Sequence, residues 1–167
     1  MPPFFVSIFI FTGTCPSGWE EFDGQCYKFV DKTPTWDEAL QECLSIGATL
    51  ASITNKATND FLLTIATKWS MVGGHHLTDG TWAWTDGSPW NFTNWAPGEP
   101  NNQNERWLWM GGPDAGGRAG KWNDGGQSWT AGTYGYICQK EPGKIHNRAE
   151  LILKQDRPVM RLLLNQQ

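Results

Sequence analysis

Apolar residues repeat with helical spacing between residues 35 and 46. They fall at i, i+3, i+4, i+7 and i+8 and are Trp36, Ala39, Leu40, Cys43 and Leu44. Such a stripe predicts an amphipathic helix with one face in the core. Thr35 and Glu38 form a capping-box pattern at its start, and Gly47 supplies a stop at its end. We therefore expect a helix over residues 35–46.

A second helical repeat follows Thr54, which we expect to be its N-cap. It runs to about Lys68, and its inward-facing residues are Ala57, Phe61, Leu62, Ile65 and Ala66. Residues 71–74 then begin the half of the chain that consists of strands and loops. Adjacent side chains diverge on a strand, and neither His75 nor His76 has a partner at ligand spacing. We expect both to be solvated loop histidines rather than zinc ligands.

Alternation of apolar and polar positions predicts short strands in the rest of the chain. Asp23-Gly24 is a tight-turn signal and predicts a hairpin within residues 15–27. The other predicted strands are 81–85, which ends at the turn Asp86-Gly87, then 107–110 and 134–139.

Two segments show little periodicity. Residues 90–102 form a long polar loop with aromatic anchors, and loops of this length are usually either functional or disordered. The anchors favour a functional loop. It contains the N-glycosylation sequon Asn91-Phe92-Thr93, whose use depends on the exposure of Asn91. The Gly-rich residues 111–120 predict a flexible loop without fixed structure.

Composition narrows the class of protein. The chain has 167 residues, enough for one stable domain with short extensions. Eleven tryptophans and nineteen glycines suit a loop-rich domain whose irregular segments are held by large aromatic side chains. The net charge of −4 argues against a nucleic-acid partner bound by basic patches.

The cysteines indicate two disulfides and an oxidising compartment. They are Cys15, Cys26, Cys43 and Cys138, and the sequence alone leaves three pairings open. None of them has the CxxC or Cys/His spacing of a zinc or redox site, which disfavours a metal role.

The two ends of the chain differ from the rest. Residues 1–14 contain the apolar run 4–11, which we interpret as part of a secretory signal peptide, although it lacks a basic start and a clean cleavage site. The alternative is an ordered first strand. The run is too short to span a bilayer. Residues 142–167 form a C-terminal tail that we expect to be mobile.

Carboxylate and amide oxygens from two segments form the candidate site. They belong to Glu99, Asn101, Glu105, Asn123 and Asp124. Ca²⁺ takes about six to eight hard oxygen ligands, so this set supplies most of them if the loops fold back on each other. Pro100 permits a cis peptide bond, which would place its flanking side chains on one side of a tight turn. Singly, each residue is also an ordinary turn residue, and only the set predicts calcium.

These motifs, with the aromatic and cysteine positions around them, resemble the C-type lectin domain family. The resemblance rests on the ordered set Cys15-Pro-Ser-Gly-Trp19, Cys26, Trp36-x-x-Ala39-x-x-x-Cys43, Gly47-Ala48-x-Leu50, Trp84-Thr85-Asp86-Gly87, Trp95, Glu99-Pro100-Asn101, Trp122-Asn123-Asp124 and Tyr136-Ile137-Cys138. It covers residues 15–141. It implies an α+β fold of two helices, small antiparallel sheets and a long calcium-binding loop region. It also implies the disulfides Cys15–Cys26 and Cys43–Cys138.

The resemblance further implies a secreted, Ca²⁺-dependent lectin, of the kind that recognises microbial glycans in innate immunity. In the family, the order Glu-Pro-Asn goes with mannose, fucose or N-acetylglucosamine, whereas Gln-Pro-Asp goes with galactose. Both partners of a further family disulfide are missing, because Trp107 and Gln127 stand at their positions. Asn102 and Arg106 stand where acidic ligands of auxiliary sites are frequent, so we expect one calcium ion.

Two other functions compete with that of a lectin. A calcium-independent protein- or ice-binding module on the same fold would carry these motifs without using them. An enzyme lacks support, because no Ser/His/Asp or Cys/His arrangement is present and glycosidases need a free carboxylate pair. The oligomeric state is not readable, since no collagen-like or coiled-coil segment is present.

Overall fold

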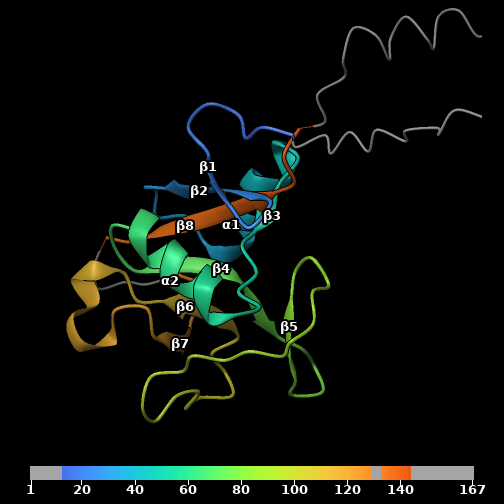
Figure 1. Cartoon of the computed structure of the whole chain (residues 1–167). Coiled ribbons are helices and arrows are strands. Elements are labelled where there is room, and N and C mark those ends of the chain that lie inside the picture. The colour runs from blue at the N-terminus through green and yellow to red at the C-terminus, as the bar shows by residue number, and fades with distance from the viewer. Residues whose placement is uncertain (1–12, 129–132, 144–167) are drawn as a thin grey trace, which may run out of the picture.

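The computed structural model describes residues 13–128 and 133–143, which form two α-helices, eight strands and one 3₁₀ helix (Figure 1). Their bounds, in chain order, are β1 Glu20–Phe22, β2 Gln25–Val30, α1 Trp36–Ser45, β3 Thr49–Leu50, α2 Lys56–Ile65, β4 Ser70–His76, β5 Trp82–Trp84, β6 Trp107–Met110, η1 Pro113–Arg118, β7 Trp122–Gly125 and β8 Gly135–Lys140. The apolar run 4–11 and all but the first two residues of the tail 142–167 lie outside the described residues.

The eight strands form one mixed sheet. Its order is β1-β2-β8-β4-β6-β7, with β3 paired to β8 and β5 paired to β4. Every pair is antiparallel except β4 with β8, which is parallel. The sequence predicts small antiparallel sheets, and this one parallel pair joins them.

Alternation along the strands divides the core between two faces of the sheet. On β8, Ile137 belongs to the cluster that contains Leu62 of α2. Its neighbours Tyr136 and Cys138 belong to the cluster that contains Cys43 of α1. Successive side chains of a strand point to opposite faces, so each helix covers a different face of the sheet.

Helix α1 confirms the predicted element and its capping box, although Leu44, which was predicted to face the core, is 50% exposed. The Thr35 side chain accepts a hydrogen bond from the Glu38 N–H at 3.3 Å, and the Glu38 carboxylate accepts one from the Thr35 N–H at 2.8 Å. Gly47 follows with a φ of 67°. Cys43 on the buried stripe is bonded to Cys138 of β8, and the sequence separation of 95 residues makes this bond a long-range constraint on the unfolded chain.

The predicted hairpin is confirmed as well. Asp23 and Gly24 both have positive φ, at 48° and 71°, as a two-residue turn between β1 and β2 requires. The disulfide Cys15–Cys26 joins β2 to the segment before β1. Thr14 pairs with Gly143, so the two ends of the described chain lie side by side, at the end of the domain opposite the long loop (Figure 1).

Helix α2 begins and ends differently from the prediction. Its N-cap is Asn55, whose side chain accepts the Thr58 N–H at 2.8 Å, and not Thr54. The helix ends at Ile65 rather than near residue 68. Ala57, which was predicted to face inward, is exposed, whereas Thr58 and Asn59 are buried. Polar partners inside the domain explain the difference, because they let an asparagine occupy a core position.

Two loop predictions were wrong. His75 and His76 lie in β4, where they are half-buried, because β4 continues to pair with β5 and β6 through these residues. Residues 111–120 contain the 3₁₀ helix η1. Its base is closed by hydrogen bonds from the Gly111 N–H to the Lys121 carbonyl and from the Gly120 N–H to the Gly111 carbonyl, at 2.9 and 2.7 Å.

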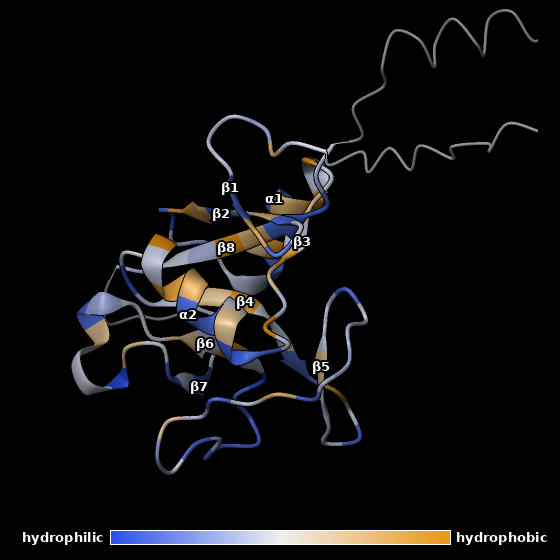
Figure 2. Ribbon diagram, in the orientation of Figure 1, coloured by the Kyte–Doolittle hydropathy of each residue, from blue (hydrophilic) through white to orange (hydrophobic). Residues whose placement is uncertain are grey.

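The hydrophobic residues gather on the central strands and helices, whereas the loop that runs beneath β5 and β7 is largely hydrophilic (Figure 2). Within residues 13–128 and 133–143, neither helix has the length and apolar character needed to cross a membrane.

Asn59 is expected to be the most sensitive polar position of α2. Its amide donates to the Gly120 carbonyl at 3.0 Å, and its carbonyl oxygen accepts from Trp122 Nε1 at 2.7 Å. Asn59→Ala leaves the buried indole N–H without a partner, so the free energy of unfolding should fall by about 2–4 kcal/mol. Denaturant unfolding measures it, with the exposed Asp60→Ala as the control. Equal effects of the two variants would contradict this role of Asn59.

Candidate functional site

Strand β7 places Asp124 beneath the long loop. The Asp124 side chain is fully buried and accepts hydrogen bonds from the N–H groups of Asn101, at 3.1 Å to each oxygen, and Asn102, at 2.9 Å. Asn101 itself is exposed. Charge-assisted bonds of this kind are stronger than neutral ones, so Asp124 fixes the loop backbone against the sheet.

Glu99 lies at the same point of the loop. The peptide bond between Glu99 and Pro100 is cis, as the sequence suggested. Only 5% of the Glu99 side chain is exposed, and its Oε2 atom is buried without a hydrogen-bond partner. Burial, then the adjacent Asp124 carboxyl and the charge of Glu105, raise the pKa of Glu99, which Arg118 partly offsets. With both carboxylates ionised, Glu99 and Asp124 repel each other.

Glu105 and Asn123 complete the predicted set. Burial, followed by the charge of Asp124, raises the pKa of Glu105. A hydrogen bond from Asn102 lowers this pKa and offsets part of the rise. The Asn123 amide donates to the Asp124 carbonyl, and its Oδ1 is buried without a partner. A cavity of about 190 Å³ is lined by Glu105, Asn123 and Asp124, together with Trp109 and Ser128.

The donor atoms of this set suit a hard cation. Two buried oxygens, on Glu99 and Asn123, have no partner, and buried polar atoms are normally paired. Among the described residues, no three His, Cys, Asp or Glu side chains form a group that could hold a metal ion. Asparagine oxygens would therefore have to contribute, and the Asp124 carboxylate has lone pairs left beside the backbone hydrogen bonds that it accepts. The residues fit calcium as a mixed set of acids and amides.

Trp122 holds the long loop next to β7. Its N–H donates to the Asn94 carbonyl at 2.9 Å, and its carbonyl accepts from the Ala96 N–H at 2.8 Å. The buried indole contacts four aromatic rings edge-on, at centroid distances of 5.6–5.8 Å, namely Trp84, Trp90, Phe92 and Trp95. The aromatic residues predicted as anchors thus pack on the strand that carries two of the candidate ligands.

A polar network ties the same loop to the residues that follow η1. The Asn94 amide donates to the Gly120 carbonyl at 2.7 Å, and its side-chain oxygen accepts from Lys121 Nζ at 2.8 Å. No local pattern predicts these contacts, because residues 111–120 were expected to have no fixed structure.

Arg118 is a further residue that the sequence analysis missed. Its Nη1 atom lies 3.7 Å from Oε1 of Glu99, and 52% of its side chain is exposed. Arg118 ends η1, so an irregular segment brings a cation to the acidic set. No spacing rule relates it to Glu99, 19 positions earlier in the chain.

Trp107 and Gln127, which stand at the positions of the missing cysteines, make other contacts. Trp107 is the partner of Gly125 in the pairing of β6 with β7. The Gln127 carbonyl accepts the Trp36 N–H at 2.8 Å, and its amide donates to the Asp37 carboxylate. The segment after β7 is therefore tied to the start of α1.

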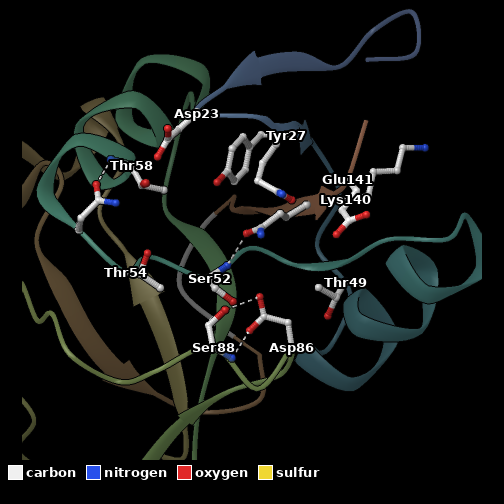
Figure 3. Close-up of a pocket in the computed structure, with 13 residues that line it drawn as sticks. Asp23, Tyr27, Thr49, Ser52, Thr54, Thr58, Asp86, Ser88, Lys140 and Glu141 are labelled. Carbon is white, nitrogen blue, oxygen red and sulfur yellow. Dashed lines mark hydrogen bonds between the residues drawn. The ribbon is translucent and has the colours of Figure 1, made fainter. Parts of the chain in front are cut away.

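A second, larger cavity of about 460 Å³ is separate from the predicted residues, none of which lines it. Figure 3 shows Asp23, Tyr27 and Ser52 around it, together with Asp86 and Thr58. Burial and the charges of Asp23 and Asp86 raise the pKa of Tyr27 to about 12, so its phenol stays neutral. The Ser52 hydroxyl is buried without a hydrogen-bond partner.

The sequon has the exposed asparagine that N-glycosylation requires. Asn91 and Thr93 are exposed, whereas Phe92 between them packs against Trp122. The neighbouring aromatic residues therefore do not bury Asn91, and its glycosylation stays a prediction.

Comparison with known proteins gives consistent results. Residues 32–140 match the family model of the lectin C-type domain. Ladderlectin of Oncorhynchus mykiss is 38% identical over 101 residues, which are 55% of this chain and 52% of that protein. The low affinity immunoglobulin epsilon Fc receptor of Mus musculus is 37% identical over 127 residues, 71% of this chain and 37% of the receptor. The chain thus spans about half, or less, of the length of these relatives.

Solved structures share the fold. The cow C-type carbohydrate-recognition domain of CD23, crystallised with a GlcNAc2Man3 oligosaccharide, superposes with a TM-score of 0.68 at 31% identity, over 78% of this chain and 98% of that one. A calcium-independent type II antifreeze protein gives the same TM-score at 27% identity, over 77% of this chain and 95% of that one. The fold predicted from the sequence is confirmed.

Glu99→Gln should stabilise the protein in EDTA at neutral pH. The native pKa of Glu99 is raised, so its ionisation costs the native state stability. That cost is absent below the unfolded pKa of about 4.3 and complete only above the raised native value. The gain in unfolding free energy should therefore grow as the pH rises from acid to neutral. Denaturant unfolding across that range measures it, with the exposed Glu20→Gln as control. A gain that does not change with pH would contradict the prediction.

Proposed function

We propose a function from the premise that this chain belongs to the C-type lectin domain family. The proposed function is that of an extracellular protein that binds carbohydrate through a calcium ion. The observation that carries the proposal is the pair of buried, unpartnered oxygens of Glu99 and Asn123 beside the buried carboxylate of Asp124. Carboxylates packed this closely repel each other, and a divalent cation provides the missing counter-charge.

Each residue of the set has a role in the proposed binding of calcium and sugar. Glu99, Asn101, Glu105, Asn123 and Asp124 would hold Ca²⁺ through side-chain oxygens, and the ion supplies open positions for two vicinal hydroxyl groups of a sugar. Glutamate oxygens accept hydrogen bonds from these hydroxyls, and asparagine amides donate to them. Asp124 additionally organises the loop, because its oxygens bind the backbone of Asn101 and Asn102.

The sugar class follows from the order of the motif. Glu99 precedes and Asn101 follows the cis-linked Pro100, the order that family members for mannose, fucose or N-acetylglucosamine carry. The CD23 domain that shares the fold was crystallised with an oligosaccharide of GlcNAc and mannose, which supports the same class here. Microbial glycans with terminal mannose are the ligands that we propose.

The proposed location is outside the cell, and the proposed role is binding rather than catalysis. Two disulfides, Cys15–Cys26 and Cys43–Cys138, favour an oxidising compartment. Carboxylates engaged with calcium would be poor general acids or bases, which disfavours hydrolysis of the bound sugar.

The alternative function is a calcium-independent protein- or ice-binding module. Two observations favour it: the aromatic rings around Trp122 and the network at Gly120 hold much of the long loop without a metal. A calcium-independent antifreeze protein also shares the fold. Ice-crystal growth assays with and without EDTA test this alternative directly.

The lectin proposal predicts retention on a mannose column in calcium and release by EDTA. Asp124→Asn should weaken calcium binding by about 10- to 100-fold and abolish retention, because it removes a buried charge from the set. Asp114→Asn, an exposed residue of η1, makes the same charge change and should behave as the unmodified protein. Retention that persists in EDTA would rule out the calcium mechanism.

The motif order predicts a change of specificity. The double variant Glu99→Gln with Asn101→Asp moves the carboxylate from one side of Pro100 to the other while keeping an oxygen at both positions. Preference should shift from mannose toward galactose, as competition by the free sugars on an immobilised glycan would show. A variant that binds calcium and still prefers mannose would show that these residues do not contact the sugar.

A further inference from the structure

Arg118 approaches the carboxylate that both the calcium ion and the sugar would use. It lies 3.7 Å from Oε1 of Glu99, while Oε2 of the same carboxylate has no partner. The two side chains differ in exposure, 52% for Arg118 and 5% for Glu99. A half-exposed guanidinium can therefore leave this pair, whereas the glutamate is held in place.

The backbone at Arg118 is fixed next to the site. The Lys121 N–H donates to the Arg118 carbonyl at 2.9 Å, within the closed base of η1. Lys121 in turn binds Asn94 of the long loop at 2.8 Å. The position of Arg118 thus follows from the fold, and only its side chain is free to move with the state of Glu99.

We propose that Arg118 is a positioning residue that pairs with Glu99 in the calcium-free domain and competes with calcium for it. The inference rests on the proposed calcium site. Without the ion, Arg118 offsets part of the repulsion among Glu99, Glu105 and Asp124. With the ion, its charge is a second cation beside the same carboxylate and opposes binding. The site consequently fills at a higher calcium concentration than its acidic residues alone would set.

The competition predicts effects of opposite sign on two measured quantities. Arg118→Gln should tighten calcium binding, because one repulsive cation is removed. The same change should lower the melting temperature in EDTA, because the buried carboxylate of Glu99 loses its counter-charge. A purely structural role of Arg118 would weaken both calcium binding and stability.

Calorimetric titration with calcium chloride alone tests the first effect. Arg118→Gln should bind calcium about three- to tenfold more tightly at low ionic strength, with a smaller gain at high salt. Arg118→Lys should stay close to the unmodified protein. The matched control is Lys140→Gln, the same charge change at a residue whose ammonium lies over the Trp19 ring, 4.2 Å from its centroid.

Thermal unfolding in EDTA tests the second effect through a double-mutant cycle with Glu99→Gln. Arg118→Gln should lower the melting temperature of the unmodified protein and leave that of Glu99→Gln unchanged. Two results would overturn the inference and leave the lectin proposal intact. One is that Arg118→Gln does not bind calcium more tightly than the unmodified protein. The other is that Arg118→Gln shifts the melting temperature equally in both backgrounds. Absence of calcium binding in every protein would overturn both.

Discussion

The site depends on the contact of Trp122 with the long loop. The indole is fully buried between α2 and the loop, and its backbone pairs with β6 on one side and with Asn94 and Ala96 on the other. Asn123 and Asp124 follow directly in the chain, so the packing of one aromatic side chain determines where two candidate ligands lie. Burial of an aromatic side chain of this size provides the free energy that an irregular loop of polar residues cannot provide for itself.

Packing and electrostatics oppose each other at this place. The aromatic rings and the Asn59–Gly120–Asn94 network bring the loop against β7, and this brings Glu99 and Glu105 close to Asp124. Burial raises the pKa values of both glutamates, which means that the calcium-free fold pays for their ionisation at neutral pH. A bound cation would turn this unfavourable contact into ligation, and Arg118 offsets part of it otherwise.

The sequence predicts those parts of the fold whose signals are local. The capping box at Thr35, the turn at Asp23-Gly24 and the cysteine pairs are confirmed, because each depends on spacing or on the family resemblance. The buried face of helix α2 was misassigned, since the buried Asn59 is stabilised by partners about 60 residues away that no local pattern reveals. Arg118 was missed for the same reason. The five candidate ligands lie near one another and their role stays a prediction, and the sequence could not show that Asp124 binds the loop backbone.

The same energetics separate the two functions considered for this domain. Trp122 and its neighbouring rings would hold the loop with or without a metal, so an ordered loop is compatible with calcium-independent binding as well. The buried oxygens of Glu99 and Asn123 are different, because nothing in the described part of the chain gives them a hydrogen bond. A calcium-independent module would be more stable with neutral, paired groups at these positions. The two oxygens therefore support the proposed cation site, in which Arg118 would set how readily the cation binds.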